Sequence, residues 1–283
     1  MEKWILMVMA PVFLALIALE AIYWSKRRPE IYSWVDTFSN AGLALLHQAA
    51  DALAWLAVIG LYYWVYQYRF FDLQTSFISV AALFIAQDFL YYWFHRASHR
   101  VRWLWASHVT HHSSERLNLS TAFRQSLTYP ISGMWVFWLP LALIGFEPEH
   151  IIAVVAINLG FQFFVHTQAI PKLGWVEKLF NTPSIHRVHH ARNPKYIDRN
   201  YAGVLVIWDR LFGTYVEEDA AVPCEFGIVG QIDSHNPITL TFHEWIVMFK
   251  DAAAAGSLRQ AWGQLVCPPE RAMAHQRAQP ELE

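Results

Sequence analysis

Five long apolar segments constrain the fold of this chain more than any other feature of its sequence. The last two hold about 16 residues each, fewer than the roughly 20 that a helix needs to cross a bilayer, and the stretch GFEPEH separates them. We therefore expect them to form a hairpin that spans with little tilt or re-enters part-way. The sequence predicts an all-α integral membrane protein with four or five transmembrane or re-entrant helices, over residues 4–25, 41–68, 76–95, 131–146 and 150–166.

Few charged residues accompany these segments. Charged residues make up 16% of the chain, against about 25% in a soluble domain. The formal net charge of -2 provides no basic surface for nucleic acid, so no nucleic-acid partner is expected. Cys224 and Cys267 are far apart in the chain and match no disulfide framework or metal-binding spacing.

The basic residues 26–28, Lys-Arg-Arg, directly follow the first apolar segment. A cleaved signal peptide has its basic residues before the apolar region and small residues after it, so a retained helix is the better interpretation. The positive-inside rule places residues 26–28 on the cytoplasmic side. Alternating crossings then bring residues 96–130 and 167–283 to that side as well. We expect a protein of the bacterial inner membrane whose histidine-rich segments face the cytoplasm.

Three histidine boxes lie at the end of an apolar segment or in the predicted cytoplasmic segments that follow. They read HRASH, HVTHH and HRVHH. Residues three or four apart share one face of a helix, so each box is expected to point its imidazoles in a common direction. Imidazole is a common metal ligand, and one four-coordinate zinc needs no more than four ligands, so this number predicts two metals; nitrogen ligands suit iron, zinc or copper. The predicted ligands are His95, His99, His108, His111, His112, His166, His186, His189 and His190.

Two carboxylates lie close enough in sequence to support these ligands. Asp88 precedes His95 by seven residues, on the same helical face. It could hold a ligand imidazole by the second ring nitrogen, or it could line a polar cavity. Glu115 follows His111 by four residues and is expected close to the metals or as a further ligand. Asp209 is expected to form a salt bridge with a nearby arginine.

The order and spacing of the boxes resemble those of the fatty acid hydroxylase/sterol desaturase superfamily, over about residues 75–216. The flanks HHSSERLNLSTAFRQS and NTPSIHRVHHARNPKYIDRNYAGVLVIWDRLFGTY are most similar to the alkylglycerol monooxygenases and their bacterial relatives. Two positions differ from that pattern: Arg100, where a glutamate is expected, and Ile185, where a histidine is expected. By the same resemblance, the polar flank residues Asn118 and Asn193 are expected to form hydrogen bonds around the metals or to contact lipid head groups.

This resemblance implies two iron ions that use O2 to hydroxylate a C–H bond of a membrane lipid. The lipid could be an ether lipid, a fatty acyl chain or a sterol-like molecule. A reductant is also implied, either tetrahydrobiopterin or an electron-donor protein of the ferredoxin or cytochrome type. Zinc could occupy the site in a purified sample, because divalent-metal affinity does not by itself favour iron. The sequence leaves the oligomeric state open.

The domain organisation expected from these features is a single membrane-embedded domain over residues 1–283. Residues 1–75 would supply N-terminal transmembrane helices, and residues 76–216 a catalytic core like that of the fatty acid hydroxylases. Residues 217–283 would form a C-terminal cytoplasmic extension. The polar segments of the core would form a cytoplasmic helical cap that holds the dimetal site.

Three alternatives to a lipid hydroxylase are weighed. A lipid or sterol desaturase uses the same metal centre but removes two hydrogens instead of inserting oxygen. A metal transporter or metal-storage protein would place ionisable groups near the bilayer midplane, whereas these histidines follow the ends of apolar segments. A structural zinc site usually contains cysteine ligands, and the boxes contain none. Oxygen chemistry on a lipid is therefore the leading hypothesis.

Overall fold

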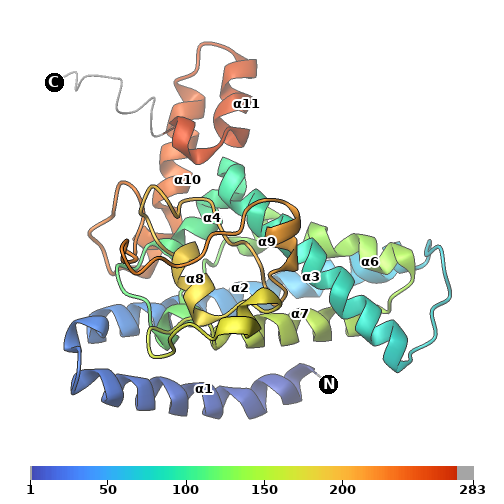
Figure 1. Ribbon diagram of the computed structural model, residues 1–283. Coiled ribbons are helices and arrows are strands. Elements are labelled where there is room, and N and C mark those ends of the chain that lie inside the picture. The colour runs from blue at the N-terminus through green and yellow to red at the C-terminus, as the bar shows by residue number, and fades with distance from the viewer. Residues whose placement is uncertain (1, 273–283) are drawn as a thin grey trace.

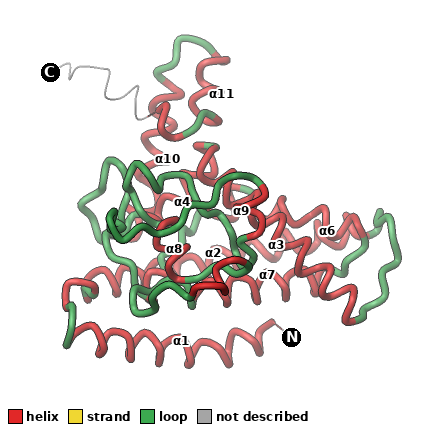
Figure 2. Tube along the Cα trace, viewed as in Figure 1, coloured by secondary structure: helices red, strands yellow, loops and turns green. Residues whose placement is uncertain are grey.

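The computed structural model describes residues 2–272, which consist of helices and loops (Figures 1 and 2). Within these residues no strand forms, and two isolated bridges occur. The prediction of an all-α protein is confirmed for this part of the chain. Its α-helices are α1 (Glu2–Ser25), α2 (Trp34–Tyr66), α3 (Phe77–Arg100), α4 (Arg102–His112), α5 (Tyr129–Ser132), α6 (Leu139–Ile144), α7 (Pro148–Phe163), α8 (Pro183–His189), α9 (Ile207–Leu211), α10 (Pro237–Ala253) and α11 (Leu258–Val266).

Four short 3-10 helices connect these elements. Their bounds are η1 (Pro29–Ile31), η2 (Leu119–Phe123), η3 (Met134–Trp138) and η4 (Gly174–Lys178). Asn118 begins η2 by accepting a hydrogen bond from the amide of Ser120, which satisfies one of the unpaired donors of a helix start. The segment that follows the second histidine box therefore has a defined conformation.

Two stretches are long and apolar enough to cross a membrane: α3, and the stretch Pro29–Tyr66 that contains α2. Only 6% of the apolar window in Pro29–Tyr66 is buried inside the protein, which is the exposure expected of a helix surrounded by lipid. The apolar parts of α1 (Met9–Ser25) and α7 are shorter than this criterion requires. Two helices of the predicted four or five therefore meet the length and composition of a membrane span.

The fourth predicted segment does not form one helix. Residues 131–146 comprise the end of α5, the turn η3 and the helix α6. Gly133 has a φ of 83°, in the left-handed region, and Pro140 lies in the first turn of α6. Glycine permits this conformation and proline cannot donate a helical hydrogen bond, so the expectation of a continuous helix is wrong here. α7 agrees with the fifth predicted segment.

A second layer, rich in loops, covers one end of the long apolar helices. α4 packs on the end of α3, and α10 packs on α4. α8 and α9 lie within the loops that Figure 2 shows in green. In Figure 1, α10 and α11 project from this layer, across the direction of α1, α2 and α7.

Buried polar contacts attach this layer to α1 and α2. Arg124 is 1% exposed, and its Nη1 lies 3.0 Å from Oδ1 of Asp36. Glu20 of α1 accepts hydrogen bonds from the amide of Leu119, at 2.7 Å, and from the hydroxyl of Thr167. A buried charge without such partners costs several kcal/mol. These contacts fix the two segments that follow α4 and α7, and both segments lie beside histidines.

Candidate metal centre

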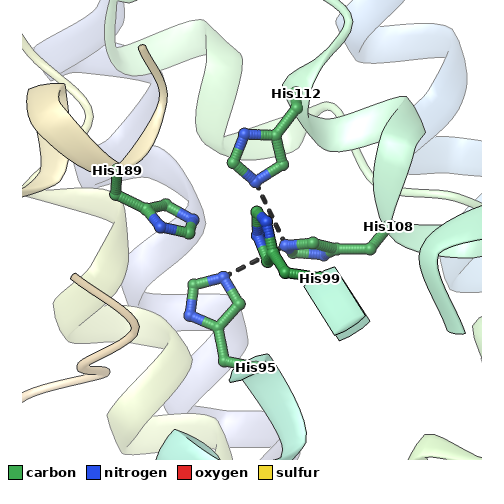
Figure 3. Close-up of side chains that lie close together, drawn as sticks. All are labelled: His95, His99, His108, His112 and His189. Atoms are coloured by element: carbon green, nitrogen blue, oxygen red, sulfur yellow. Dashed lines mark hydrogen bonds between the residues drawn. The ribbon is translucent and has the colours of Figure 1, made fainter. Parts of the chain in front are cut away.

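All nine predicted histidines lie together and are buried. They form two groups, and the candidate ligand atoms within each group lie within 4.8 Å of one another. Figure 3 shows the larger group, with its rings turned toward a common centre. The first group contains His95, His99, His108, His112 and His189, and the second group contains His111, His166, His186 and His190.

Each HxxHH box contributes to both groups. α4 gives His108 and His112 to the first group and its middle histidine to the second. The third box does the reverse, giving His189 to the first group and its other two histidines to the second. The rings of His112 and His190 lie 4.4 Å apart between centroids, so the groups adjoin. The expectation that each box points its imidazoles in a common direction is confirmed for the HRASH box, whose two histidines join one group, and is wrong for the two HxxHH boxes, which divide between two centres.

The outer nitrogens of four rings bond to backbone carbonyls. A carbonyl oxygen only accepts, so Nδ1 of such a neutral ring carries the hydrogen and Nε2 keeps a lone pair. This arrangement turns a ligand nitrogen inward on each ring. The pairs are His95 Nδ1 with Tyr201 O (2.9 Å), His111 Nδ1 with Arg124 O (3.2 Å), His166 Nδ1 with Gln162 O (2.6 Å) and His189 Nδ1 with Arg199 O (3.0 Å).

In one facing pair of inner nitrogens, neither atom carries a hydrogen. Nε2 of His111 lies 3.1 Å from Nε2 of His166, although Nδ1 of each ring carries its hydrogen. Two lone pairs at this distance repel unless a cation lies between them. In the first group, Nε2 of His99 and Nε2 of His189 are buried without a hydrogen-bond partner among the described residues, and such orphaned atoms are costly. The donor sets of both groups therefore fit metal ions.

Burial keeps these imidazoles neutral. Desolvation lowers the pKa of His108, His111 and His186 well below the usual value, and neighbouring imidazoles lower it further. Desolvation also lowers the pKa of His166 to about 4. The neutral ring is the form that binds a metal, so at neutral pH these four residues need release no proton to act as ligands.

The chemistry of the donors limits the kind of metal. Within the described residues, neither group includes a carboxylate oxygen or a thiol. Calcium and magnesium require oxygen ligands, whereas imidazole suits iron, zinc, copper and nickel. The two groups therefore fit first-row transition metals.

Asp88 is not hydrogen-bonded to an imidazole, so the first of its two predicted alternatives, holding a ligand ring, is wrong. Its carboxylate accepts hydrogen bonds from the amides of Val204 (2.8 Å) and Leu205 (3.0 Å). Asp209 forms no salt bridge within the described residues and instead accepts from the amide of Tyr201 at 2.8 Å; burial raises the pKa of Asp209 to about 6. The two carboxylates together hold the segment whose carbonyl positions the first ring of the HRASH box.

The other three predicted supporting residues also form no hydrogen bond to the imidazoles. Glu115 is more than half exposed and lies 3.7 Å from a guanidinium nitrogen of Arg192. Asn118 caps η2, and Asn193 joins two loops through backbone hydrogen bonds. The expectation that these residues form hydrogen bonds around the metals is therefore wrong, because each stabilises a loop or helix start instead.

Some side chains that contact the ligands were missed by the sequence reasoning, among them Tyr129 and Asp198. The hydroxyl of Tyr129 lies 2.7 Å from Nδ1 of His108. Oδ1 of Asp198 lies 3.6 Å from Nδ1 of His99, and Asp198 has a φ of 59°, a left-handed conformation that aspartate adopts more readily than most residues. Asp198 could have been found as a carboxylate close after the third box. Tyr129 gives no such signal, because it is an aromatic residue just before the apolar segment at 131–146.

A cavity of about 370 Å³ leads to the first group. Its volume lies in the range of sites for small molecules. His99, His112, His189 and His190 line this cavity. We call it the histidine cavity; its apolar lining includes Trp105, Val109, Ile197, Ile228, Ile232 and Val247. It can therefore admit an apolar molecule to the imidazoles.

Comparison with known proteins agrees with this site. Residues 80–214 match the model of the family described as fatty acid hydroxylase. Alkylglycerol monooxygenase of Homo sapiens is 40% identical over 237 residues, which cover 82% of this chain and 52% of the relative. The Xenopus tropicalis protein of the same name is 46% identical over 167 residues, covering 59% of this chain and 36% of the relative. An ornithine lipid hydroxylase of Rhizobium tropici is 29% identical over 157 residues, 56% of this chain and 47% of that protein.

The matched region contains both histidine groups in full. All nine histidines lie within residues 80–214. This chain spans about half the length of the curated relatives it matches. No solved structure matches. By its residues 80–214 and its similarity to the alkylglycerol monooxygenases, the chain belongs to the fatty acid hydroxylase family.

Proposed function

We propose that this chain is a membrane-bound lipid hydroxylase whose two histidine groups hold two iron ions. The proposal depends on one observation: in a buried, neutral cluster, ring nitrogens that carry lone pairs point at one another. Nε2 of His111 and Nε2 of His166, for example, lie 3.1 Å apart. Each group would bind one ion through its imidazole nitrogens. Bound iron would supply the oxidising power of O2 that an unactivated C–H bond requires and that protein side chains lack.

The residues of this chain would prepare the site in three ways. Backbone carbonyls such as those of Tyr201 and Gln162 hold the protons on Nδ1 and so aim Nε2 inward. Burial of the imidazoles excludes bulk water from the reacting centre. The histidine cavity would orient the apolar chain of a lipid toward His99 and His112. Hydroxylation also consumes two electrons, which a reduced pterin or a ferredoxin- or cytochrome-type protein would deliver.

The substrate is proposed to be a lipid with a long apolar chain. Two kinds of relatives have names that refer to lipids, alkylglycerol and ornithine lipid respectively, and the lining of the histidine cavity is mainly apolar. An ether lipid or a fatty acyl chain fits this lining. The proposal includes a single membrane-embedded domain over residues 1–283, with four or five membrane helices.

The orientation is proposed from the basic residues that follow α1. Lys26, Arg27 and Arg28 lie at the end of α1, and basic residues favour the cytoplasmic side. The histidine-bearing layer would then face the cytoplasm of a bacterial inner membrane, where it could meet both the lipid and a soluble electron donor. Labelling of single cysteines in intact cells tests this orientation separately from the chemistry.

The chemistry is tested by metal analysis of the purified protein and mass spectrometry of lipids from cells that express it. The wild type should hold about two metal ions per chain, as the two ligand groups require, and produce lipids that have gained one oxygen atom. His111→Ala should lose metal and product. His150→Ala is the matched control, because His150 lies at the start of α7 beside Glu147, outside both groups.

Each other outcome has a distinct meaning. If His111→Ala gave the same oxygenated lipid as the wild type, the proposed site would be wrong. Products that lack two hydrogens would identify a desaturase using the same centre. Metal flux in proteoliposomes without oxygen consumption would indicate a transporter.

A further inference from the structure

The helices α10 and α11 form a hairpin that projects from the body of the protein (Figure 1). α10 is attached to α4 through a small buried cluster that includes Ala106, Trp245 and Met248. The rest of the hairpin exposes several large apolar side chains. Exposed apolar surface of this extent marks a contact with a membrane or with another protein.

The exposed apolar residues follow helical spacing on both helices. On α10 they are eight and three residues apart, and on α11 they are four and four apart, so each set lies along one side of its helix. Leu258 is 91% exposed and Trp262 is 65% exposed. We call this set the hairpin stripe; it consists of Ile238, Ile246, Phe249, Leu258, Trp262 and Val266.

The hairpin begins beside the apolar helix α2. A Cβ added to Gly42 of α2 would lie 3.2 Å from Cγ of Pro237, the first residue of α10. The exposed leucines of α2 begin just beyond this contact, at Leu45, which is 73% exposed, and continue to Leu56, which is 79% exposed. α10 therefore begins beside the exposed apolar face of α2, which includes Trp34 and Phe38 before this contact as well as the leucines after it. In Figure 1 the hairpin then runs across the direction of α2, as a helix lying along a membrane surface would.

The acidic side chains of the hairpin point into the protein, and its basic side chains are exposed. The acidic residues Glu244 and Asp251 turn inward, where Arg102 pairs with both at 2.7 Å. Lys250 and Arg259 are exposed, and neither has an ion-pair partner within residues 2–272. Exposed cations beside an apolar stripe that includes a tryptophan match an anionic lipid surface.

We propose that the hairpin stripe lies on the surface of the same bilayer that α2 enters, with Lys250 and Arg259 at anionic headgroups. This proposal rests on the proposed membrane insertion and is independent of the oxygen chemistry. Val247 of α10 and Pro269, just after α11, line the histidine cavity. The docked hairpin therefore holds the cavity beside the lipid, so that a lipid can enter it without crossing water.

Nitroxide labels in the full-length protein test the docking. Leu258→Cys and Trp262→Cys are each labelled after Cys224 and Cys267 have been replaced by serine, and the protein is placed in nanodiscs of phosphatidylcholine with or without phosphatidylglycerol. Electron paramagnetic resonance then compares access of O2, which concentrates in lipid, with access of a water-soluble nickel chelate. Gln260→Cys is the matched control, because two residues along α11 turn its label about 200° away from that of Leu258.

Labels at 258 and 262 should favour O2 over nickel by several fold, and the label at 260 should favour nickel. Replacing both Lys250 and Arg259 by glutamate should reduce the O2 preference in anionic nanodiscs and leave it unchanged in neutral ones. Equal nickel access at 258 and 260 would overturn the proposal. Protection of 258 and 262 from both reagents would also overturn it, because a protein surface or a second copy would then cover the stripe.

A label at Leu53→Cys, on the exposed apolar face of α2, separates this proposal from the wider one. O2 preference at 53 with nickel access at 258 would reject docking of the hairpin and keep membrane insertion. Nickel access at both positions would reject membrane insertion itself. Native metal content of each labelled variant shows that it has folded.

Discussion

The substitution Asp88→Asn tests how the structure around the metal centre is held in place, without changing any metal ligand. Asp88 is fully buried in α3 and accepts four hydrogen bonds through two oxygens. Oδ1 accepts from Val204 N and from Asn158 Nδ2, and Oδ2 accepts from Leu205 N and Trp208 Nε1. Asparagine has the same shape but offers one oxygen and one NH2 group. Whichever way the amide turns, two of the four donors face another donor.

The expected cost follows from those two lost bonds. A hydrogen bond to a charged group contributes about 1.5–3 kcal/mol, so the substitution should cost about 3–6 kcal/mol. For a chain of this size, each kcal/mol corresponds to roughly 2–4 °C of melting temperature, which predicts a fall on the order of 10 °C. The loosened segment also carries Tyr201, whose carbonyl holds the ring of His95. Metal should therefore leave the variant more readily as well.

The assay is tryptophan fluorescence during heating of the detergent-solubilised protein, with metal content measured before and after a fixed exposure to chelator. Asp72→Asn is the matched control, because Asp72 is exposed and, among residues 2–272, pairs with Arg69 alone, a kind of surface pair that contributes at most about 1 kcal/mol. If Asp88→Asn melted within 2 °C of Asp72→Asn, as a loss of less than about 1 kcal/mol would give, the four hydrogen bonds would not support the fold as argued.

Three further predictions concern the ligands. Asp198→Asn removes the carboxylate beside Nδ1 of His99 and should weaken metal retention about 10- to 100-fold, measured as the chelator concentration that removes half the metal. Tyr129→Phe removes the hydroxyl at Nδ1 of His108 and should change the optical or paramagnetic spectrum of the iron-loaded protein while the melting temperature falls by less than that of Asp88→Asn. In chelator-treated protein, burial lowers the pKa of His166 from 6.5 to about 4, so the unfolded state takes up the proton first. Stability should then be full above pH 6.5 and fall by up to about 3 kcal/mol toward pH 4, and a flat melting profile from pH 7 to 5 would contradict this.

The sequence predicts which histidines meet in the cluster, because the spacing within each box and the metal-binding chemistry of imidazole can both be recognised in the sequence itself. Three boxes with spacings of three and four residues place imidazoles at neighbouring positions of a helix, and apolar segments identify α2 and α3. His166 was found because it ends an apolar segment on the same predicted side as the boxes. The prediction of an all-α fold within the described residues follows from the same apolar segments.

The contacts around the ligands could not be predicted in the same way. Four ligand rings are held by backbone carbonyls, and every residue has a carbonyl, so no sequence signal marks those of Tyr201 or Gln162. Asp88 has the right spacing to reach an imidazole, but the fold brings the amides of Val204 and Leu205 to it from 116 and 117 residues away. Such long-range pairings depend on tertiary structure. The break at Gly133 illustrates the same limit, since an apolar segment does not reveal its own turns.

The division of the HxxHH boxes between two centres follows from helix geometry. Successive residues turn by about 100°, so positions i and i+4 differ by about 40°, whereas positions i+3 and i+4 differ by about 100°. On α4, His108 and His112 therefore share one centre and His111 is directed to the next, and the third box repeats this with His189 as the single member. Two such boxes facing each other give each centre one pair and one single imidazole. The first box adds a pair to one centre and His166 completes the other, which accounts for five ligands in the first group and four in the second.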